Sequence, residues 1–392
     1  MIRMLLVGYC HSIRSERRRC EEVRVNLAYC WFCRLGLEDR VPDHSTFSVS
    51  RPGRFRDSDL FRQVFETVVR CCMEAGLVGG EGFAVNASVI KANASRFQRV
   101  EGSEIDWTDE QRSTRTVREY MAALESDNLP TNPEQKPKAL SPVDPAAAWT
   151  TRGRNKVMFG YSLNYLIDMD HAVIVEATPT PTRVTKEVDA TETMIQRAKR
   201  RFSLSPDRVA GDVAYGTGEM PGWLTDRGIA PHIPVWDKGK RDDGTFSRED
   251  FDYDEESDVC ICPGGNVLKT TGKVHDGKTL LYRASKRDCD PCPFKPNCCP
   301  NAPSRKLSRD VNEAARDRVR IIMKTDAYND SARQRKRVET LFGEAKRTLG
   351  LTRLRLRGLS GATDEFLLTA TVQNLKRLAK LAAIPPPKSA YA

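Results

Sequence analysis

The sequence of 392 residues predicts an α/β protein, with a mixed β-sheet flanked by helices, an all-helical region before it and a small cysteine-bearing insertion. Three observations favour this class. Apolar residues recur with helical spacing through residues 1–78. Segments of alternating polarity and amphipathic helical segments then follow one another up to residue 236. Six of the twelve cysteines lie between residues 260 and 299, in a stretch without regular periodicity.

Composition and charge limit the classes of function. With 39% hydrophobic residues the chain can build real cores, and it has no run of about 20 apolar residues that would cross a bilayer. We expect no membrane association, a cytoplasmic location and reduced thiols. Residues 301–358 hold 16 basic and 7 acidic residues and so carry most of the net charge of +10. Such a block favours a polyanion such as DNA or RNA, although it is equally typical of a solvated helical face.

The first 78 residues predict helices with apolar positions at helical spacing. Two helical segments flank the loop "VPDHSTFSVSRPGRF", which carries Arg51, Arg54 and Arg56. A helix-turn-helix that binds duplex DNA and a helical hairpin that binds nothing both fit. Cys30 and Cys33 lie beside aromatic residues, where buried thiols are more common than metal ligands. The apolar positions of the first segment are Val23, Val25, Leu27, Trp31 and Phe32.

The centre of the chain predicts five strands and two helices in a recognisable order. The strands are "GFAVNASVIKANAS", "KVMFGYSLNYLIDMD", "HAVIVEATPT", "DRVAGDVAYGTGE" and "APHIPVW". A tight turn joins the second strand to the third, and helices follow the third and the fourth. Residues 96–150 are polar and rich in proline and predict a loop. A strong helix resumes at residue 331. The RNase H-like pattern has this order of elements: three strands, a helix, a strand, a helix, a strand and a late helix.

In an RNase H-like fold three acidic residues meet at the sheet edge, and the corresponding places here hold Asn86, Asp212 and Glu339. Carboxylates in such an arrangement clamp two divalent metals roughly 4 Å apart, which suits phosphodiester cleavage. Oxygen ligands favour Mg²⁺ or Mn²⁺, so Asp212 and Glu339 are the predicted metal ligands. Taken alone, an Asp at a strand end such as Asp212 is usually a helix cap or a solvated loop residue, and Arg335, Glu339 and Lys346 could form an ordinary surface ladder of charges.

At these residues the chain resembles a bacterial insertion-sequence transposase of the DDE class. The late helix of that family carries Tyr, two residues, Arg, three residues, Glu, six residues and Lys. Arg335, Glu339 and Lys346 match this spacing, whereas Ala332 replaces the tyrosine. "VPDHSTFS", "GYSLNYLIDMDHAVI", "GDVAYGTGE" and "RGLSGATDEFLLTATVQNLKRL" extend the resemblance over nearly the whole chain. The resemblance implies binding of double-stranded transposon ends and target DNA by a homodimer or higher assembly.

The stretch from 238 to 330 predicts an inserted, zinc-ribbon-like unit. "CICPGGNVL" and "CDPCPFKPNCC" supply a close pair of cysteines, a gap, and a CxxC with a further cysteine six residues on. This is near zinc-ribbon spacing, although the first half is CxC rather than CxxC and chance clustering of reduced cysteines is the alternative. The predicted ligands of a structural Zn²⁺ are Cys262, Cys289, Cys292 and Cys298.

The sequence thus predicts a DDE-type DNA transposase that cleaves and transfers DNA strands with bound metal. Arg335, Lys346 and Arg347 are the expected DNA contacts, and Asn86 is expected to impair catalysis because an amide brings no negative charge. A DNA-binding protein without catalysis is the alternative, and an RNase H-like nuclease acting on RNA is a third. Relatives usually begin several dozen residues earlier, so we expect a truncated N-terminus. The predicted domains are 1–78 (helical, DNA-binding), 79–237 and 331–384 (catalytic), and 238–330 (the insertion).

Overall fold

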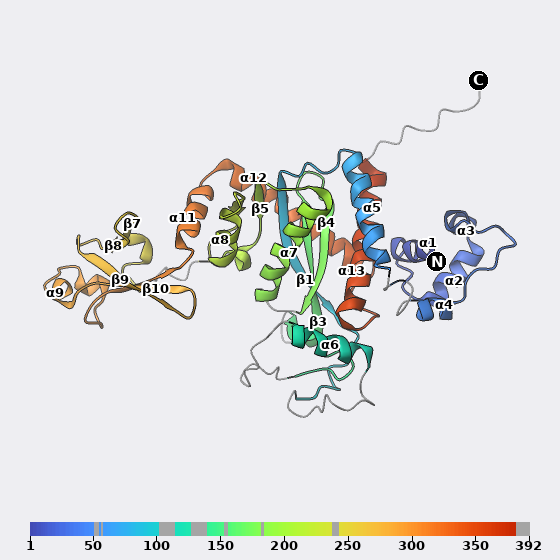
Figure 1. Ribbon diagram of the computed structural model, residues 1–392, viewed down its shortest axis with the longest axis horizontal. Coiled ribbons are helices and arrows are strands. Elements are labelled where there is room, and N and C mark those ends of the chain that lie inside the picture. Colours follow the sequence, from blue (N-terminus) through green and yellow to red (C-terminus); the bar gives the residue numbers. More distant parts are fainter. Residues whose placement is uncertain are drawn as a thin grey trace, which may run out of the picture. The chain divides into compact units, whose positions relative to one another are not determined.

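A computed structural model describes residues 1–50, 55, 58–101, 114–126, 139–152, 156–181, 184–236 and 243–381. The chain forms two compact units. The first contains Met1–Ala210 and Ser331–Ala392, and the second contains Gly211–Asp330. Figure 1 labels many of the elements of both units.

The first unit begins with a group of short helices. These are α1 (Ile2–Cys10), α2 (Glu16–Val25), α3 (Leu27–Cys33) and α4 (His44–Ser50), and the longer α5 (Leu60–Glu74) follows. Side-chain caps set two of the starts: Ser15 accepts from the backbone N–H of Arg18, and Asn26 accepts from that of Ala28. The helical N-terminal region is therefore as predicted.

Most of the apolar positions named in the first predicted segment are exposed. Val23 is fully buried, but Val25 is 77%, Leu27 68% and Trp31 81% exposed. Spacing shows on which side of a helix the apolar residues gather, and it does not show whether another element covers that side. Cys30 agrees with its structural interpretation, since it is buried and its thiol donates to the carbonyl of Val23 at 2.8 Å.

A mixed β-sheet forms the centre of the first unit, and it confirms the predicted RNase H-like α/β class. Its strands are β1 (Gly82–Lys91), β2 (Ala148–Arg152), β3 (Lys156–Asp168), β4 (Ile174–Pro181) and β5 (Arg208–Ala210). The order is β2-β3-β1-β5, and β4 also pairs with β3. β1 runs antiparallel to β3 and parallel to β5. The predicted turn between the second and third strands is also present, at residues 169–171.

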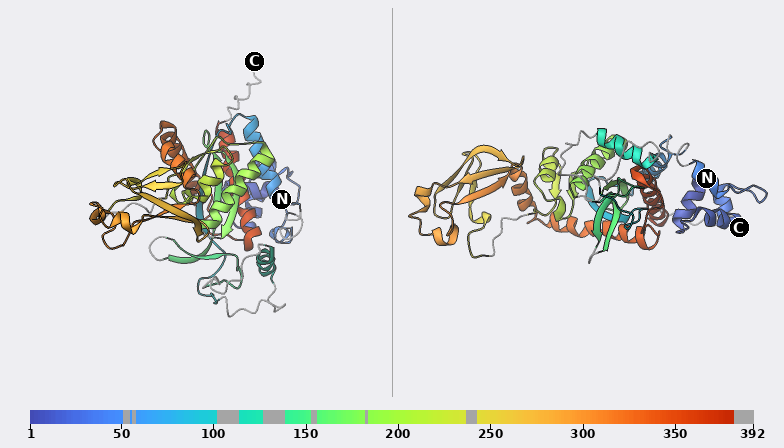
Figure 2. Two further views of the ribbon diagram at one scale, coloured as in Figure 1. Left: turned by 60° about the vertical axis from the view of Figure 1, so that its left-hand side comes forward. Right: turned by 90° about the horizontal axis from the view of Figure 1, so that it is seen from below.

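Helices cover both faces of this sheet. Ser162 of β3 donates to Glu187 of α7 (Val184–Phe202), whereas Tyr165 of β3 donates to Gln373 of α13 (Gly358–Leu381). Residues three apart in a strand point to opposite faces, so α7 and α13 lie on opposite sides. The right-hand view of Figure 2 shows the yellow-green α7 and the orange α12 (Asp326–Arg347) on either side of the strands. α5 packs against α13 through a small core that includes Val68, Cys72 and Leu375.

Three elements differ from the sequence prediction. The predicted loop 96–150 contains the helix α6 (Arg115–Ser126) and most of strand β2. α12 begins at Asp326, five residues before the predicted start at residue 331. α6 was missed because proline-rich and charged residues surround it, so that its amphipathic pattern covers only about three turns.

The second unit contains a β-sheet of its own. The short elements Val213–Tyr215 (η4), α8 (Glu219–Thr225) and β6 (Ala230–His232) come first. An antiparallel sheet follows, of order β11-β10-β9-β8-β7. Its strands and neighbouring elements are η5 (Arg248–Asp250), β7 (Asp252–Asp254), β8 (Val259–Ile261), β9 (Val267–His275), β10 (Thr279–Arg283), α9 (Lys286–Cys289), α10 (Lys295–Cys298), β11 (Lys306–Asp310) and α11 (Glu313–Ile322). A separate core built on Cys260, Leu268 and Tyr282 holds the sheet together.

Candidate active site

Asn86 lies in the middle of β1, on the face that α12 and α13 cover. Its register partner on the antiparallel strand β3 is Tyr165, and directly opposite residues share a face of the sheet. The Tyr165 ring stacks on Phe342 of α12, with ring centroids 4.9 Å apart and an interplanar angle of 13°. Burial raises the pKa of the Tyr165 phenol far above its usual range, so this hydroxyl remains a neutral donor to Gln373.

The Asn86 side chain makes one local contact. Its Oδ1 accepts a hydrogen bond of 2.8 Å from the backbone N–H of Ala87, the next residue along the strand. The side chain is partly buried, in contrast to the fully enclosed residues Phe83, Ala84 and Val85 that precede it in β1. Asn86 therefore stands where the strand passes from the buried core to a more accessible surface.

Lys346 reaches the same face of β1 from α12. Its Nζ lies 2.5 Å from Oγ of Ser88, which follows Asn86 by two residues and so points to the same side. The sequence interpretation did not single out Ser88. The signal was present, since a small hydroxyl two residues after the candidate position leaves room for a long side chain from a covering helix. The structure thus brings Lys346 and Asn86 to one face of one strand.

Glu339 and Arg347 lie on α12 with more contact with solvent, whereas Arg335 is partly buried. The Glu339 side chain is 59% exposed, and its Oε1 lies 3.6 Å from NH1 of Arg335 four residues earlier. Because Glu339 is mainly exposed, the pair contributes little to stability, about 0–1 kcal/mol. Arg347 is also exposed. Among the hydrogen bonds of the described residues none joins Glu339 to Asn86.

Asp212 belongs to the second unit, two residues after the end of β5. It is the N-cap of the short 3-10 helix at residues 213–215, and its Oδ1 accepts from the backbone N–H of Ala214 at 2.9 Å. Gly216 is needed here, because a Cβ on it would lie 1.8 Å from the carbonyl oxygen of Pro234. Asp212 is thus a cap, and it remains partly exposed.

The donor atoms at the three predicted positions suit a hard cation only in part. Two carboxylates and an amide oxygen are all oxygen donors, which Mg²⁺ and Mn²⁺ prefer. Within the described part of the chain, no group of three or more His, Cys, Asp or Glu side chains is arranged to hold a metal ion. With Asn86 in the first position, the predicted set itself contains only two such residues.

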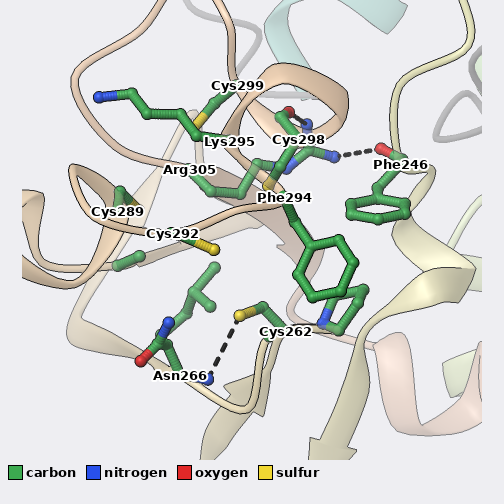
Figure 3. Close-up of a pocket in the computed structure, with 14 residues that line it drawn as sticks. Phe246, Cys262, Asn266, Cys289, Cys292, Phe294, Lys295, Cys298, Cys299 and Arg305 are labelled. Atoms are coloured by element: carbon green, nitrogen blue, oxygen red, sulfur yellow. Dashed lines mark hydrogen bonds between the residues drawn. The ribbon is translucent and has the colours of Figure 1, made fainter.

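The predicted zinc ligands line one small pocket in the second unit (Figure 3). Cys262, Cys289, Cys292 and Cys298 all border it, and so does Cys299. A Cβ on Gly264 would lie 3.3 Å from Sγ of Cys292 and 3.7 Å from Sγ of Cys262, so these two sulfurs flank a common point.

The geometry of these sulfurs does not confirm a zinc site. Cys262 Sγ accepts from the backbone N–H of Asn266 at 3.3 Å (Figure 3). Burial raises the pKa of the Cys298 thiol to about 11. Among the described residues, which include all of these cysteines, no group of three or more His, Cys, Asp or Glu side chains is arranged to hold a metal ion. The zinc ligand set therefore stays a prediction.

The remaining predicted contacts of the N-terminal region cannot be placed. Arg51, Arg54 and Arg56 lie outside the described residues. His44, at the start of α4, is described: its imidazole approaches Asp43 at 3.1 Å, and hydrogen bonds from Ser45 hold the pKa of Asp43 at about 2. No helix in the described parts of the chain has the length and apolar character needed to cross a membrane.

Comparisons with known protein families match both ends of the chain. Residues 261–379 match the transposase DDE domain, and residues 1–52 match a transposase domain designated DUF772. The first match includes Glu339 and the four predicted zinc ligands of the insertion, and it leaves Asn86 and Asp212 outside. No curated protein matches the sequence. Taken with the mixed sheet and the helical N-terminal region, the two matches make the chain similar to DDE-type insertion-sequence transposases.

Proposed function

We propose that the chain binds the ends of its transposon and that Asn86, Asp212 and Glu339 occupy the three positions of its metal-dependent strand-cleaving site. The observation that carries this proposal is the register of β1. Ala84 pairs with Ala210 of the parallel strand β5, and each of these residues is followed two positions later by a predicted site residue, Asn86 and Asp212. In neighbouring parallel strands, two residues that follow a register pair by the same number of positions lie side by side.

The chain's own residues would bind the metals and the DNA. Asp212 and Glu339 supply carboxylate oxygens, Asn86 supplies an amide oxygen, and Lys346 stands beside Asn86 on the same face of β1. Bound Mg²⁺ or Mn²⁺ supplies charge neutralisation at the phosphate and at the attacking and leaving oxygens. Water attack on phosphorus breaks the P–O bond and leaves a 3′ hydroxyl. That hydroxyl then attacks a phosphate of the target DNA and displaces a second 3′ oxygen, which takes up a proton.

Asn86 weakens this site in the proposal, because the donor set carries two negative charges in place of three. The affinity for divalent metal and the rate of nicking should both be low. An inactive, DNA-binding descendant of a transposase is the alternative that Asn86 favours. The substitution Asn86→Asp distinguishes the weakened metal site from the inactive DNA-binding protein.

Asn86→Asp should raise the affinity for Mn²⁺ by about tenfold, the equivalent of about 1.4 kcal/mol, in a calorimetric titration. The same variant should nick supercoiled plasmid in Mn²⁺ faster than the unmodified chain. Asn301→Asp is a matched control, since it adds the same charge at an exposed turn of the insertion. The double variant Asn86→Asp with Asp212→Ala should lose the gain in both measurements.

Two results would contradict the proposal. Equal Mn²⁺ affinity for the Asn86→Asp and Asn301→Asp variants would mean that Asn86 has no part in metal binding. Efficient nicking by the unmodified chain that Asp212→Ala and Glu339→Ala abolish would show that two carboxylates and an amide are sufficient, so that the chain is not impaired.

We also propose that the cysteine pocket of the insertion binds one structural zinc through Cys262, Cys289, Cys292 and Cys298. The support is that all four border one small pocket. Since the sulfurs as placed form no metal-binding group, binding would require the cysteine side chains to rotate about their Cα–Cβ bonds. Such a zinc would stabilise the insertion and take no part in strand cleavage.

A further inference from the structure

Another pocket, which lies in the first unit, opens at the far end of β1, away from Asn86. It has a volume of about 600 Å³, and its border contains three cations, Lys91, Arg96 and Arg353. The exposed ring of Phe97 and the side chains of Val157 and Met158 supply its apolar surface. Lys91 ends β1 five residues after Asn86, which corresponds to about 16 Å along an extended strand.

Among the described residues, the positive charge of this pocket has no counterpart. None of the described residues that border the pocket is Asp or Glu, and no salt bridge between described residues involves Lys91, Arg96 or Arg353. Other arginines of the same unit are paired: Arg14 pairs with Glu365, and Arg115 with Glu119. Three unneutralised cations around one opening indicate an anionic ligand that is supplied from outside.

The backbone around the pocket is held in place before any ligand binds. The chain after α12 returns to the end of β1, where the N–H of Leu354 donates to the carbonyl of Lys91 at 2.8 Å. The Asn93 side chain makes two hydrogen bonds with this returning segment. Its Nδ2 donates to the carbonyl of Arg355 at 2.8 Å, and its Oδ1 accepts from the guanidinium of Arg353 at 3.0 Å. Leu351 and Leu354 are buried beneath it. The guanidinium of Arg353 is therefore preorganised at the rim.

Phe97 gives the pocket an aromatic surface that is exposed to solvent. The residue is 82% exposed, although it is large and apolar, and the guanidinium of Arg96 lies 4.6 Å from its ring centroid. An exposed aromatic ring among cations matches the two parts of a nucleotide, because a base can stack on the ring while its phosphate meets the cations. An acidic peptide would use the cations and leave the ring without a function.

We propose that this pocket binds an unpaired segment of DNA, with a base against Phe97 and phosphates at Lys91 and Arg353. The strand must be unpaired there, because the faces of bases in a duplex are covered by their stacked neighbours. This inference rests on the proposed function, in which DNA strands are opened and joined at the site marked by Asn86. A segment bound about 16 Å away lies a few nucleotides from the bond that is cleaved.

The test compares two DNA probes with the full chain: a blunt duplex, and the same duplex with four unpaired nucleotides at one end, both labelled with fluorescein. Phe97→Ala should weaken binding of the frayed probe about tenfold and that of the blunt probe less than about twofold. Ile321→Ala is the matched control, since Ile321 is 68% exposed on α11 and should affect neither probe. With 2-aminopurine in the unpaired segment, stacking on Phe97 should quench its fluorescence, and Phe97→Ala should remove the quenching.

The cations are tested through salt dependence. The double variant Lys91→Ala with Arg353→Ala should reduce the slope of log affinity against log salt for the frayed probe by about 1.4, or about 0.7 for each phosphate lost. Lys199→Ala with Arg200→Ala removes the same charge from the exposed end of α7 and should leave the slope unaltered.

Three results would overturn this assignment. Equal losses on blunt and frayed probes would show a general electrostatic surface, and an effect of Phe97→Ala no larger than that of Ile321→Ala would exclude stacking. An unaltered salt slope in the Lys91 and Arg353 double variant would exclude phosphate contact. Each of these leaves the proposed function standing if the unmodified chain binds duplex DNA, whereas failure to bind either probe contradicts both proposals.

Discussion

Single residues in this chain show how position in the fold decides what a polar group does. Asp144 is fully buried, accepts hydrogen bonds from the hydroxyl of Tyr161 and the backbone N–H of Gly358, and has its second oxygen without a partner. Glu339 carries the same chemical group but is mainly exposed beside Arg335. The buried carboxylate therefore bears on stability, whereas the exposed one is available to a ligand.

Asp144 should make folding stability depend on pH in the direction opposite to a salt-bridged carboxylate. Burial raises its pKa from 3.8 to about 6, so the folded chain holds this proton more tightly than the unfolded chain. The stabilisation is complete below about pH 4 and is lost as pH rises through about 6, in total about 3 kcal/mol. Asp144→Asn keeps the acceptor oxygen and removes the charge.

The measurement is urea unfolding of both forms at several pH values. From pH 4 to pH 8 the free energy of unfolding of Asp144→Asn should rise by about 3 kcal/mol relative to that of the unmodified chain. Other carboxylates titrate equally in both forms and cancel in the difference. If the two pH profiles run parallel, Asp144 does not titrate in this range in the folded protein.

At the scale of elements, α12 has one side of buried apolar residues and an adjoining side of polar residues. Val338, Leu341 and Phe342 are buried against the unit, while Glu339, Arg335 and Lys346 lie on an adjoining side. Of these three polar residues, Lys346 reaches back to β1, where it meets Ser88. Its ammonium is thereby held on the face of β1 that carries Asn86, whereas Glu339 and Arg335 pair with each other, with Glu339 mainly exposed and Arg335 partly buried.

Lys346→Ala should weaken binding to DNA by a similar factor for every sequence and lower the salt slope by about one, because one phosphate contact is lost. Arg335→Ala should do the same if its pairing with Glu339 leaves it free to contact phosphate. Lys380→Ala, at the exposed end of α13, is the control. Fluorescence anisotropy between 50 and 200 mM salt measures both quantities, and an unaltered slope for Lys346→Ala would assign this residue to the fold alone.

The elements that the sequence predicted well are those whose pattern is long. β1, β3 and α7 have 10, 13 and 19 residues, and each was placed within a few residues of its position. The short strands β7 and β8 of the second unit have three residues each, too few to show a period, so these two strands were not foreseen. The Asn86, Asp212 and Glu339 positions came from element order and resemblance, whereas the Ser88 contact and the Phe97 pocket depend on how the chain after α12 returns to β1.

For the whole molecule, the insertion is the part with the most independent core. The antiparallel sheet β7–β11 encloses apolar residues that all come from between residues 251 and 307, so its packing does not draw on the sheet that carries Asn86. The two compact units have separate internal packing as well. A ligand that stabilises the insertion should therefore leave the stability of the first unit unaffected.

Zinc should be present at about one per chain after purification under reducing conditions, and a chelator should increase hydrogen exchange in residues 252–310 while the amides of β1 keep their protection. The physical reason is that small sheets with short strands gain much of their order from a metal cross-link. Cys292→Ser should abolish the zinc content, whereas Cys71→Ser, on α5 in the first unit, should not. The zinc site is contradicted if elemental analysis finds no zinc, or if a chelator increases hydrogen exchange in β1 as much as in the insertion. The five cysteines that border the pocket would then be reduced thiols of an ordinary core.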